Sequence, residues 1–152
     1  MSNEARHAVV EALVELARSP DHRDRADAGR GLAGFAEMPE AREPLLRLVL
    51  DGGDTFVTRV TAEALLRRQD PSGLAVVASA LAAVGPDRPD HLDWIHTAVL
   101  DVFTVFSGER DAAVRVCEEL ARGSDEQVRR GAGLLIDALA GIEPILRPAR
   151  GG

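Results

Sequence analysis

The sequence predicts an all-α protein, a superhelix (solenoid) of about four helix pairs. Apolar residues recur at three- and four-residue intervals along most of the chain, which is the spacing of one helix face. No segment alternates apolar and polar residues for the length of a strand, so strands are not expected. Similar helical patterns return along the chain, and the first position of each stripe lies 33, 38 and 33 residues after the one before, at Asp24, Val57, Ile95 and Val128. Such a period is typical of stacked repeats.

The first two helix pairs are expected at about residues 3–36 and 40–68. Asp21 and Asp54 stand where a side chain would accept from the free N–H groups of the second helix of each pair. Pro44 is placed in the first turn of a helix, where no backbone donor is needed. The turns between helices are predicted at SPD, MPE and DGGD.

The next two pairs are expected at about residues 71–106 and 109–140. Pro71 suits a first turn, and Asp125 suits an N-cap. Residues 141–152 follow as a C-terminal capping tail, and the whole chain, 1–152, is predicted to be a single domain. The tail segment EPILR repeats EPLLR of residues 43–47, so we expect it to form a short fifth helix over the last core face.

Several residues are assigned to the core by their position in these patterns. The predicted third pair contributes an apolar stripe: Ile95, Val99, Val102, Phe103 and Phe106. Cys117 also falls on an apolar stripe, and a buried cysteine behaves as a small hydrophobe. Glycine inside a helix costs about 1 kcal/mol relative to alanine. Gly29 and Gly133 therefore indicate positions where neighbouring helices approach closely.

The repeats resemble HEAT repeats, especially the short bacterial kind related to phycobilisome-lyase-like proteins. The segment DEQVRRGAG at residues 125–133 carries the resemblance best, and the block at residues 43–66 is similar to that family's helix–turn–helix unit. The resemblance implies a right-handed superhelix whose second helices line a concave binding surface. It says almost nothing about activity, because the shared motif consists of packing residues. The third repeat departs from the motif, with an insertion around GPDRPD.

Charge limits the partners. The net charge is −7, and all 18 basic residues are Arg. Binding to a nucleic-acid backbone depends on clustered cations, and here acids and arginines are interspersed. We therefore expect a protein or peptide partner, more easily a basic one, or a small ligand, and we do not expect nucleic acid or an anionic membrane. The acidic start MSNEARHAVV and the single cysteine predict a cytoplasmic protein. The oligomeric state is left open.

The chain has no motif that predicts a reaction. Phosphate-binding loops, dinucleotide fingerprints, serine-nucleophile elbows and cysteine pairs are all missing from the sequence. Asp93 and His96 share a helix face but have no third ligand, so no metal, cofactor or catalytic residue is predicted. Some alkylpurine DNA glycosylases are similar in architecture, and Trp94 with Asp101 would then act at the lesion. The acidic charge disfavours this alternative.

The second helices of the pairs offer a candidate binding face. The residues predicted to point away from the core on these helices include Ala26 and Leu134, together with a candidate binding set of Phe56, Arg59, Glu63, Trp94, Thr97, Asp101 and Arg130. Phe56 and Trp94 hold equivalent positions in adjacent repeats, and aromatic and Arg residues dominate interface energies. The alternative is that both rings cover the edges between helices and are partly buried there.

We therefore expect a non-catalytic interaction module that binds a partner on its concave face. An adaptor, an inhibitor such as an immunity-type protein against a basic toxin, and a regulatory subunit all fit this reading. The alternatives are a DNA-glycosylase-type enzyme and a binder of a small ligand or tetrapyrrole.

Overall fold

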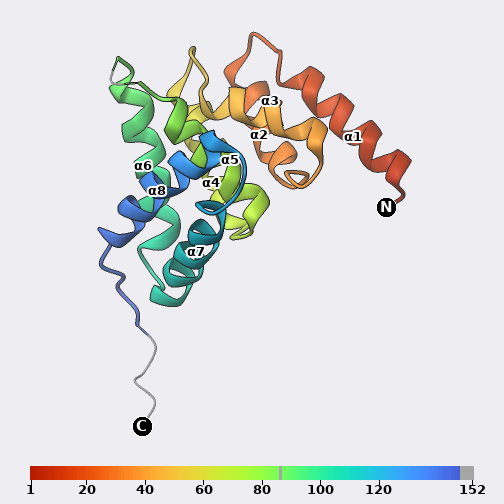
Figure 1. The fold of residues 1–152 in the computed structure, drawn as a ribbon. Coiled ribbons are helices and arrows are strands. Elements are labelled where there is room, and N and C mark those ends of the chain that lie inside the picture. Colours follow the sequence, from red (N-terminus) through yellow and green to blue (C-terminus); the bar gives the residue numbers. More distant parts are fainter. Residues whose placement is uncertain (86, 148–152) are drawn as a thin grey trace.

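The computed structural model describes residues 1–85 and 87–147. In that part of the chain eight helices follow one another, and the only β-structure is a single isolated bridge. The predicted all-α class is confirmed, and the arrangement is compatible with a superhelix of helix pairs (Figure 1). The helices are α1 (Asn3–Leu16), α2 (His22–Ala33), α3 (Pro39–Val49), α4 (Thr55–Arg67), α5 (Pro71–Ala83), α6 (Pro89–Phe103), α7 (Ser107–Leu120) and α8 (Glu126–Ala140).

Aspartates begin most of the helices for the reason that the sequence suggested. The carboxylates of Asp21, Asp54 and Asp125 accept from backbone N–H groups in the first turns of α2, α4 and α8, which confirms these three N-caps. Pro71 opens α5, as predicted. The placement of Pro44 was wrong, because α3 already begins at Pro39 and Pro44 lies inside it. Without an N–H, Pro44 leaves a first-turn carbonyl of α3 without its usual donor.

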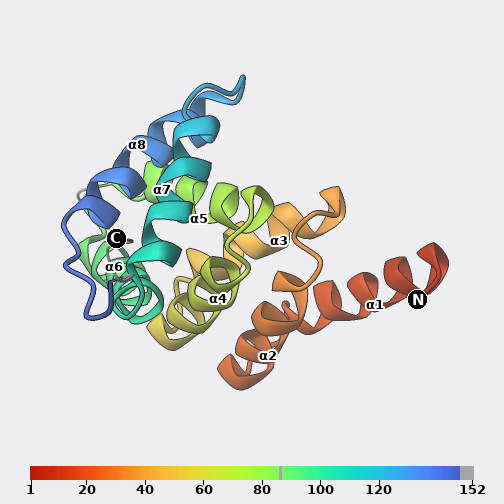
Figure 2. The same cartoon turned by 90° about the horizontal axis from the view of Figure 1, so that it is seen from below.

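Helices α2, α4 and α6 lie side by side in one row, and each packs extensively on the next (Figure 2). Helix α5 lies behind this row and is almost entirely buried from Gly73 to Leu81. Its sequence, PSGLAVVASALAA, has no charged residue, so every side of the helix can be covered by neighbours. Helices α3, α4, α7 and α8 all pack against it.

The last pair does not extend the row. Helix α8 packs mainly on α5 and α7 and touches α6 only slightly. At the crossing of α5 and α8 the two backbones approach closely, because a Cβ added at Gly131 would lie 1.7 Å from the carbonyl oxygen of Ala78. Next to this crossing the Gln127 amide donates to the carbonyl of Ser79, at 3.0 Å. A regular stack would have placed α8 against α6.

The predicted close approaches at glycine were half right. A Cβ at Gly29 would lie 2.0 Å from Oγ1 of the buried Thr61, so Gly29 allows α2 to approach α4. Gly133 was assigned wrongly, since a Cβ there would meet nothing within 4 Å. The close approach in α8 belongs to Gly131 instead, because α8 turns that side to α5.

The segment after α8 is not a fifth helix, which corrects that expectation for residues 143–147. It is extended and runs parallel to residues 104–107, where the N–H of Ile145 donates to Thr104 (2.8 Å) and that of Leu146 to Val105 (2.7 Å). The assignment of Phe106 to the core was also wrong, since its side chain is 48% exposed. Helix α6 ends at Phe103, and the extended backbone of Phe106 before α7 turns its ring away from the helical stripe. Residues 148–152 of the expected capping tail lie outside the described residues.

Arg68 connects three segments at the ends of α2 and α4. Its guanidinium donates to the carbonyl of Ala33 (3.0 Å) and to the Asp70 carboxylate (2.7 Å), and lies 3.0 Å from the carboxylate of Glu37. Asp70 in turn caps α5 by accepting from the N–H of Gly73. The hydrogen bond from Arg68 holds the pKa of Asp70 below its usual value. The pKa of Glu37 is also lowered, first by a hydrogen bond from its own backbone N–H and then by Arg6 and Arg68.

The two α8 glycines should respond oppositely to alanine. Gly133→Ala should raise the free energy of unfolding by about 1 kcal/mol, because the position is helical with open space around it. Gly131→Ala is the matched control and should lower it by several kcal/mol, because the methyl group would overlap the α5 backbone. Urea unfolding followed by far-ultraviolet circular dichroism measures both. A loss of stability in Gly133→Ala would contradict the assignment.

The Arg68 cluster predicts a loss of stability in acid. A carboxylate whose pKa is lowered by folding stabilises the fold above its unfolded pKa of about 4, and this contribution is lost as the pH falls towards the folded value. Unfolding at a series of pH values should therefore show falling stability below about pH 4, and Asp70→Asn should have a shallower slope there. An unchanged slope in Asp70→Asn would show that this carboxylate does not contribute.

Candidate functional site

The two aromatic residues predicted for the binding face are both partly exposed. Phe56 in the first turn of α4 is 42% exposed, and Trp94 in α6 is 36% exposed. Neither ring belongs to the fully buried core, but both are partly covered, as the alternative of rings at the edges between helices also predicts. The exposed side chain of Leu100 lies on the same helix as Trp94, at 51% exposure. The row of α2, α4 and α6 therefore carries exposed apolar groups on two adjacent helices.

Residues of α2 partly cover the ring of Phe56. The ring of His22 meets it edge-on, with the ring centroids 6.5 Å apart and the planes at 83°. The guanidinium carbon of Arg30 lies 5.8 Å from the centre of the same ring, within the range of a cation–π contact. The sequence had no visible partner for His22. Its place in the first turn of α2, the neighbour of α4 in the row, accounts for the contact.

Most of the predicted polar residues are already paired within the chain. Arg59 of α4 and Asp101 of α6 lie 3.5 Å apart, which confirms that these two residues share one face. Glu63 accepts from Arg67 one turn later, at 2.8 Å. The Thr97 hydroxyl donates to the carbonyl of Asp93 in its own helix. These exposed pairs each contribute at most about 1 kcal/mol.

Two residues do not lie where the face was predicted. Ala26 was expected to point away from the core, but it is buried, with 1% exposure. Arg130 is exposed, yet it belongs to α8, which packs on α5 and does not continue the row. The structure therefore brings together Phe56, Arg59, Trp94 and Asp101 on two adjacent helices and separates Arg130 from the row formed by α2, α4 and α6.

Two contacts align α4 with α6. His91 meets the carbonyl of Asp51, 40 residues away in sequence, and Asp101 meets Arg59, 42 residues away. The same offset of 40 to 42 residues places Trp94 opposite residues 52–54, in the loop just before Phe56 and the first turn of α4. The two rings thus lie near one end of the row, beside the loops that precede α4 and α6.

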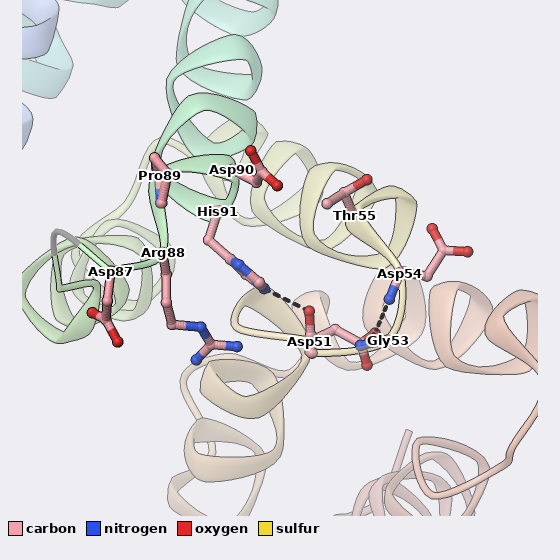
Figure 3. A pocket seen from close by; sticks show the side chains of 10 residues that line it. Asp51, Gly53, Asp54, Thr55, Asp87, Arg88, Pro89, Asp90 and His91 are labelled. Carbon is pink, nitrogen blue, oxygen red and sulfur yellow. Dashed lines mark hydrogen bonds between the residues drawn. The ribbon is translucent and has the colours of Figure 1, made fainter.

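That end of the row has an open pocket of about 600 Å³, formed by residues 51–55 and 87–91 (Figure 3). Asp51 is the centre of its polar contacts. Its carboxylate accepts from Arg25 at 3.0 and 3.3 Å and from the N–H groups of Gly53 and Asp54 at 3.1 and 2.8 Å. Its carbonyl oxygen lies 2.6 Å from Nε2 of His91, which must carry the proton because a carbonyl only accepts.

The sequence does not predict this junction. Its patterns indicate only that DGGD is a turn ending in the N-cap Asp54, and they predict no role for Arg25 or His91. Arg25 also donates to the carbonyls of Ser19 and Pro20, so its guanidinium connects two inter-helix turns. A usable signal was present, since Arg25 and His91 both lie near the start of a second helix, on the side of the loops. Their shared partner, Asp51, could not be predicted in the same way. His91 meets its backbone carbonyl, and every residue has such a group.

The described residues hold no cluster of metal ligands, and the cysteine among them is buried. Within residues 1–85 and 87–147, no three His, Cys, Asp or Glu side chains are grouped as metal ligands would be. Cys117 is fully buried, as predicted, and burial raises the pKa of its thiol to about 11, so the thiolate is scarce at neutral pH. No helix in this part of the chain is both long and apolar enough to cross a membrane.

Comparison with known proteins does not show a family for this chain. No family model matches the chain, and no curated protein matches it. One solved structure, described as an engineered protein from the Northeast Structural Genomics Consortium, is similar at 21% identity with a TM-score of 0.39. The match covers 86% of this chain and 62% of that one, so the chain spans less than two thirds of its length. Similarity at this level supports no argument about family or function.

The contacts of Asp51 should contribute to the stability of the fold at the end of the α2, α4 and α6 row where the loops lie. Asp51→Ala should lower the free energy of unfolding by about 2 kcal/mol, because the largely buried Arg25 would lose its carboxylate partner. Asp87→Ala, an exposed carboxylate of the same pocket, is the control and should change it by less than about 0.5 kcal/mol. Urea unfolding of both variants is the measurement. Equal effects would show that Asp51 has no special role.

Proposed function

We propose that the chain is a non-catalytic, HEAT-like interaction module that binds a protein partner on the face formed by α2, α4 and α6. The observation that supports this best is the partial exposure of Phe56 and Trp94 on adjacent helices. Large aromatic side chains bury 150–250 Å² each and are frequent interface anchors. A monomer has no evident use for two such rings on one surface.

The surroundings of the rings favour an interface over a catalytic site. Arg59 and Asp101 pair with each other, and Arg30 lies over Phe56. These charged groups therefore make contacts between neighbouring helices of the face. The proposed module is cytoplasmic and acts as an adaptor, an inhibitor or a regulatory subunit.

Two other classes of function remain as alternatives with their own tests. A DNA-glycosylase-type enzyme would bind DNA in a salt-sensitive way, whereas the proposed module shows no shift of DNA in a gel at low salt. A small-ligand or tetrapyrrole binder would retain colour or a ligand after purification. The net charge of −7 and the Arg59–Asp101 pair, which occupies the carboxylate that a glycosylase would use, weigh against the enzyme.

The proposal is tested at the two rings. A partner recovered with the tagged protein from its native host is purified, and its affinity is measured by calorimetry. Trp94→Ala and Phe56→Ala should each weaken binding roughly tenfold or more. Thermal stability should change less than on truncation of a core ring, because both side chains are partly exposed in the free protein.

Phe106→Ala provides the matched control, since Phe106 is also an exposed phenylalanine but follows the C-terminal end of α6. It should bind the partner as the parent does. Loss of binding in Phe106→Ala alone, or a large loss of thermal stability in Trp94→Ala, would show that the face is assigned wrongly.

A further inference from the structure

Helix α6 has one buried side and one largely exposed side. Ile95, Ala98, Val99, Val102 and Phe103 face the core and are all buried. The residues on the other side lie within an arc of about 120° at 100° per residue. They are Asp90, Asp93, Trp94, Thr97, Leu100 and Asp101, and all but the half-buried Thr97 are exposed.

This outer stripe combines apolar surface with charge of one sign. Trp94 and Leu100 are its apolar members, at 36% and 51% exposure. Its charged members are three aspartates, and no Arg occurs anywhere in α6. In most of the chain acids and arginines alternate, so a helix with acids alone is an exception.

The three aspartates differ in what neutralises them. Asp101 pairs with Arg59 of α4. Among the residues that the structure describes, no cationic side chain lies within 4.0 Å of Asp90 or Asp93. Asp90 also borders the pocket in front of α6, together with Asp54 and Asp87 (Figure 3). Within the described residues, the start of α6 therefore carries two acids without a cation within 4.0 Å, close to Trp94, while Arg88 borders the same pocket.

We propose that the outer stripe of α6 binds a cationic amphipathic segment of a partner protein. The segment places an apolar side chain on Trp94 and Leu100 and its Lys or Arg side chains opposite Asp90 and Asp93. This inference rests on the proposed function and adds the chemical class of the partner. Charge complementarity carries it, because an apolar patch with unpaired acids at its edge attracts basic segments and repels acidic ones.

The chain offers a direct probe of this stripe. Trp94 is the only Trp, and there is no Tyr, so intrinsic fluorescence excited at the red edge reports on this site alone. The probe is a synthetic amphipathic helical peptide of Leu and Lys, without aromatic residues. Titration should shift the Trp94 emission to shorter wavelength as the indole leaves water. A peptide of the same pattern with Glu in place of Lys should give no shift.

The acids are tested by a charge-matched comparison. Asp90→Asn combined with Asp93→Asn should weaken binding of the Leu/Lys peptide roughly tenfold at low salt and reduce its salt dependence. Glu118→Gln combined with Glu119→Gln makes the same change of net charge on the exposed surface of α7 and should leave the affinity unchanged. The single variant Asp93→Asn is a further control. It keeps Asp90, the acid in the first turn of α6, so the N-terminus of the helix retains its stabilising charge.

The outcomes separate this inference from the proposed function. Equal weakening by the α7 control pair, or equal binding of the Glu peptide, would overturn the cationic segment. If Trp94→Ala abolishes binding of the recovered partner while Asp90→Asn/Asp93→Asn does not, the interaction face stands and its partner is not basic. An increase in mass to that of a dimer without peptide, seen by light scattering, would mean that a second copy occupies the stripe and would also overturn the inference.

Discussion

The alignment of α2, α4 and α6 depends on Asp51. This residue is the last before the glycines of the turn that leads into α4, and its two kinds of oxygen serve different helices. The carboxylate holds Arg25 of α2, and the carbonyl holds His91 of α6. Hydrophobic packing between helices tolerates sliding, whereas these short directional contacts do not. The positions of Phe56 and Trp94 relative to each other follow from this alignment.

The sequence was sufficient for the class of the fold and for most helix starts, since periodicity, N-cap aspartates and N-terminal prolines are local signals. It failed where a neighbour decides the outcome. Gly131 and Gly133 look alike in sequence, and only the direction in which α8 crosses α5 distinguishes them. Phe106 continues the helical stripe on paper, but α6 stops at Phe103 because a new helix begins at Ser107.

The candidate site divides in the same way. The partial exposure of Phe56 and Trp94 agrees with counting positions along one helix face, whereas the pairing of Arg59 with Asp101 was not predicted. The position of Arg130 was predicted wrongly, because the prediction assumed that the fourth helix pair packs on the third as the third packs on the second. Helix α5 explains the failure. A helix with no charge on any side offers α8 a larger apolar surface than the outer stripe of α6 does.

The extended segment after α8 has a topological effect. Its hydrogen bonds to residues 104–107 close a loop that contains the whole of α7 and α8, although α8 itself hardly packs on α6. Closing a loop restricts the chain inside it, so the α7–α8 hairpin and the end of α6 are joined into one cooperative unit. The amide hydrogens of Ile145 and Leu146 are the donors of the hydrogen bonds that close this loop. The last helix pair is thus joined to the row by backbone at its edge, while its apolar contacts go to α5.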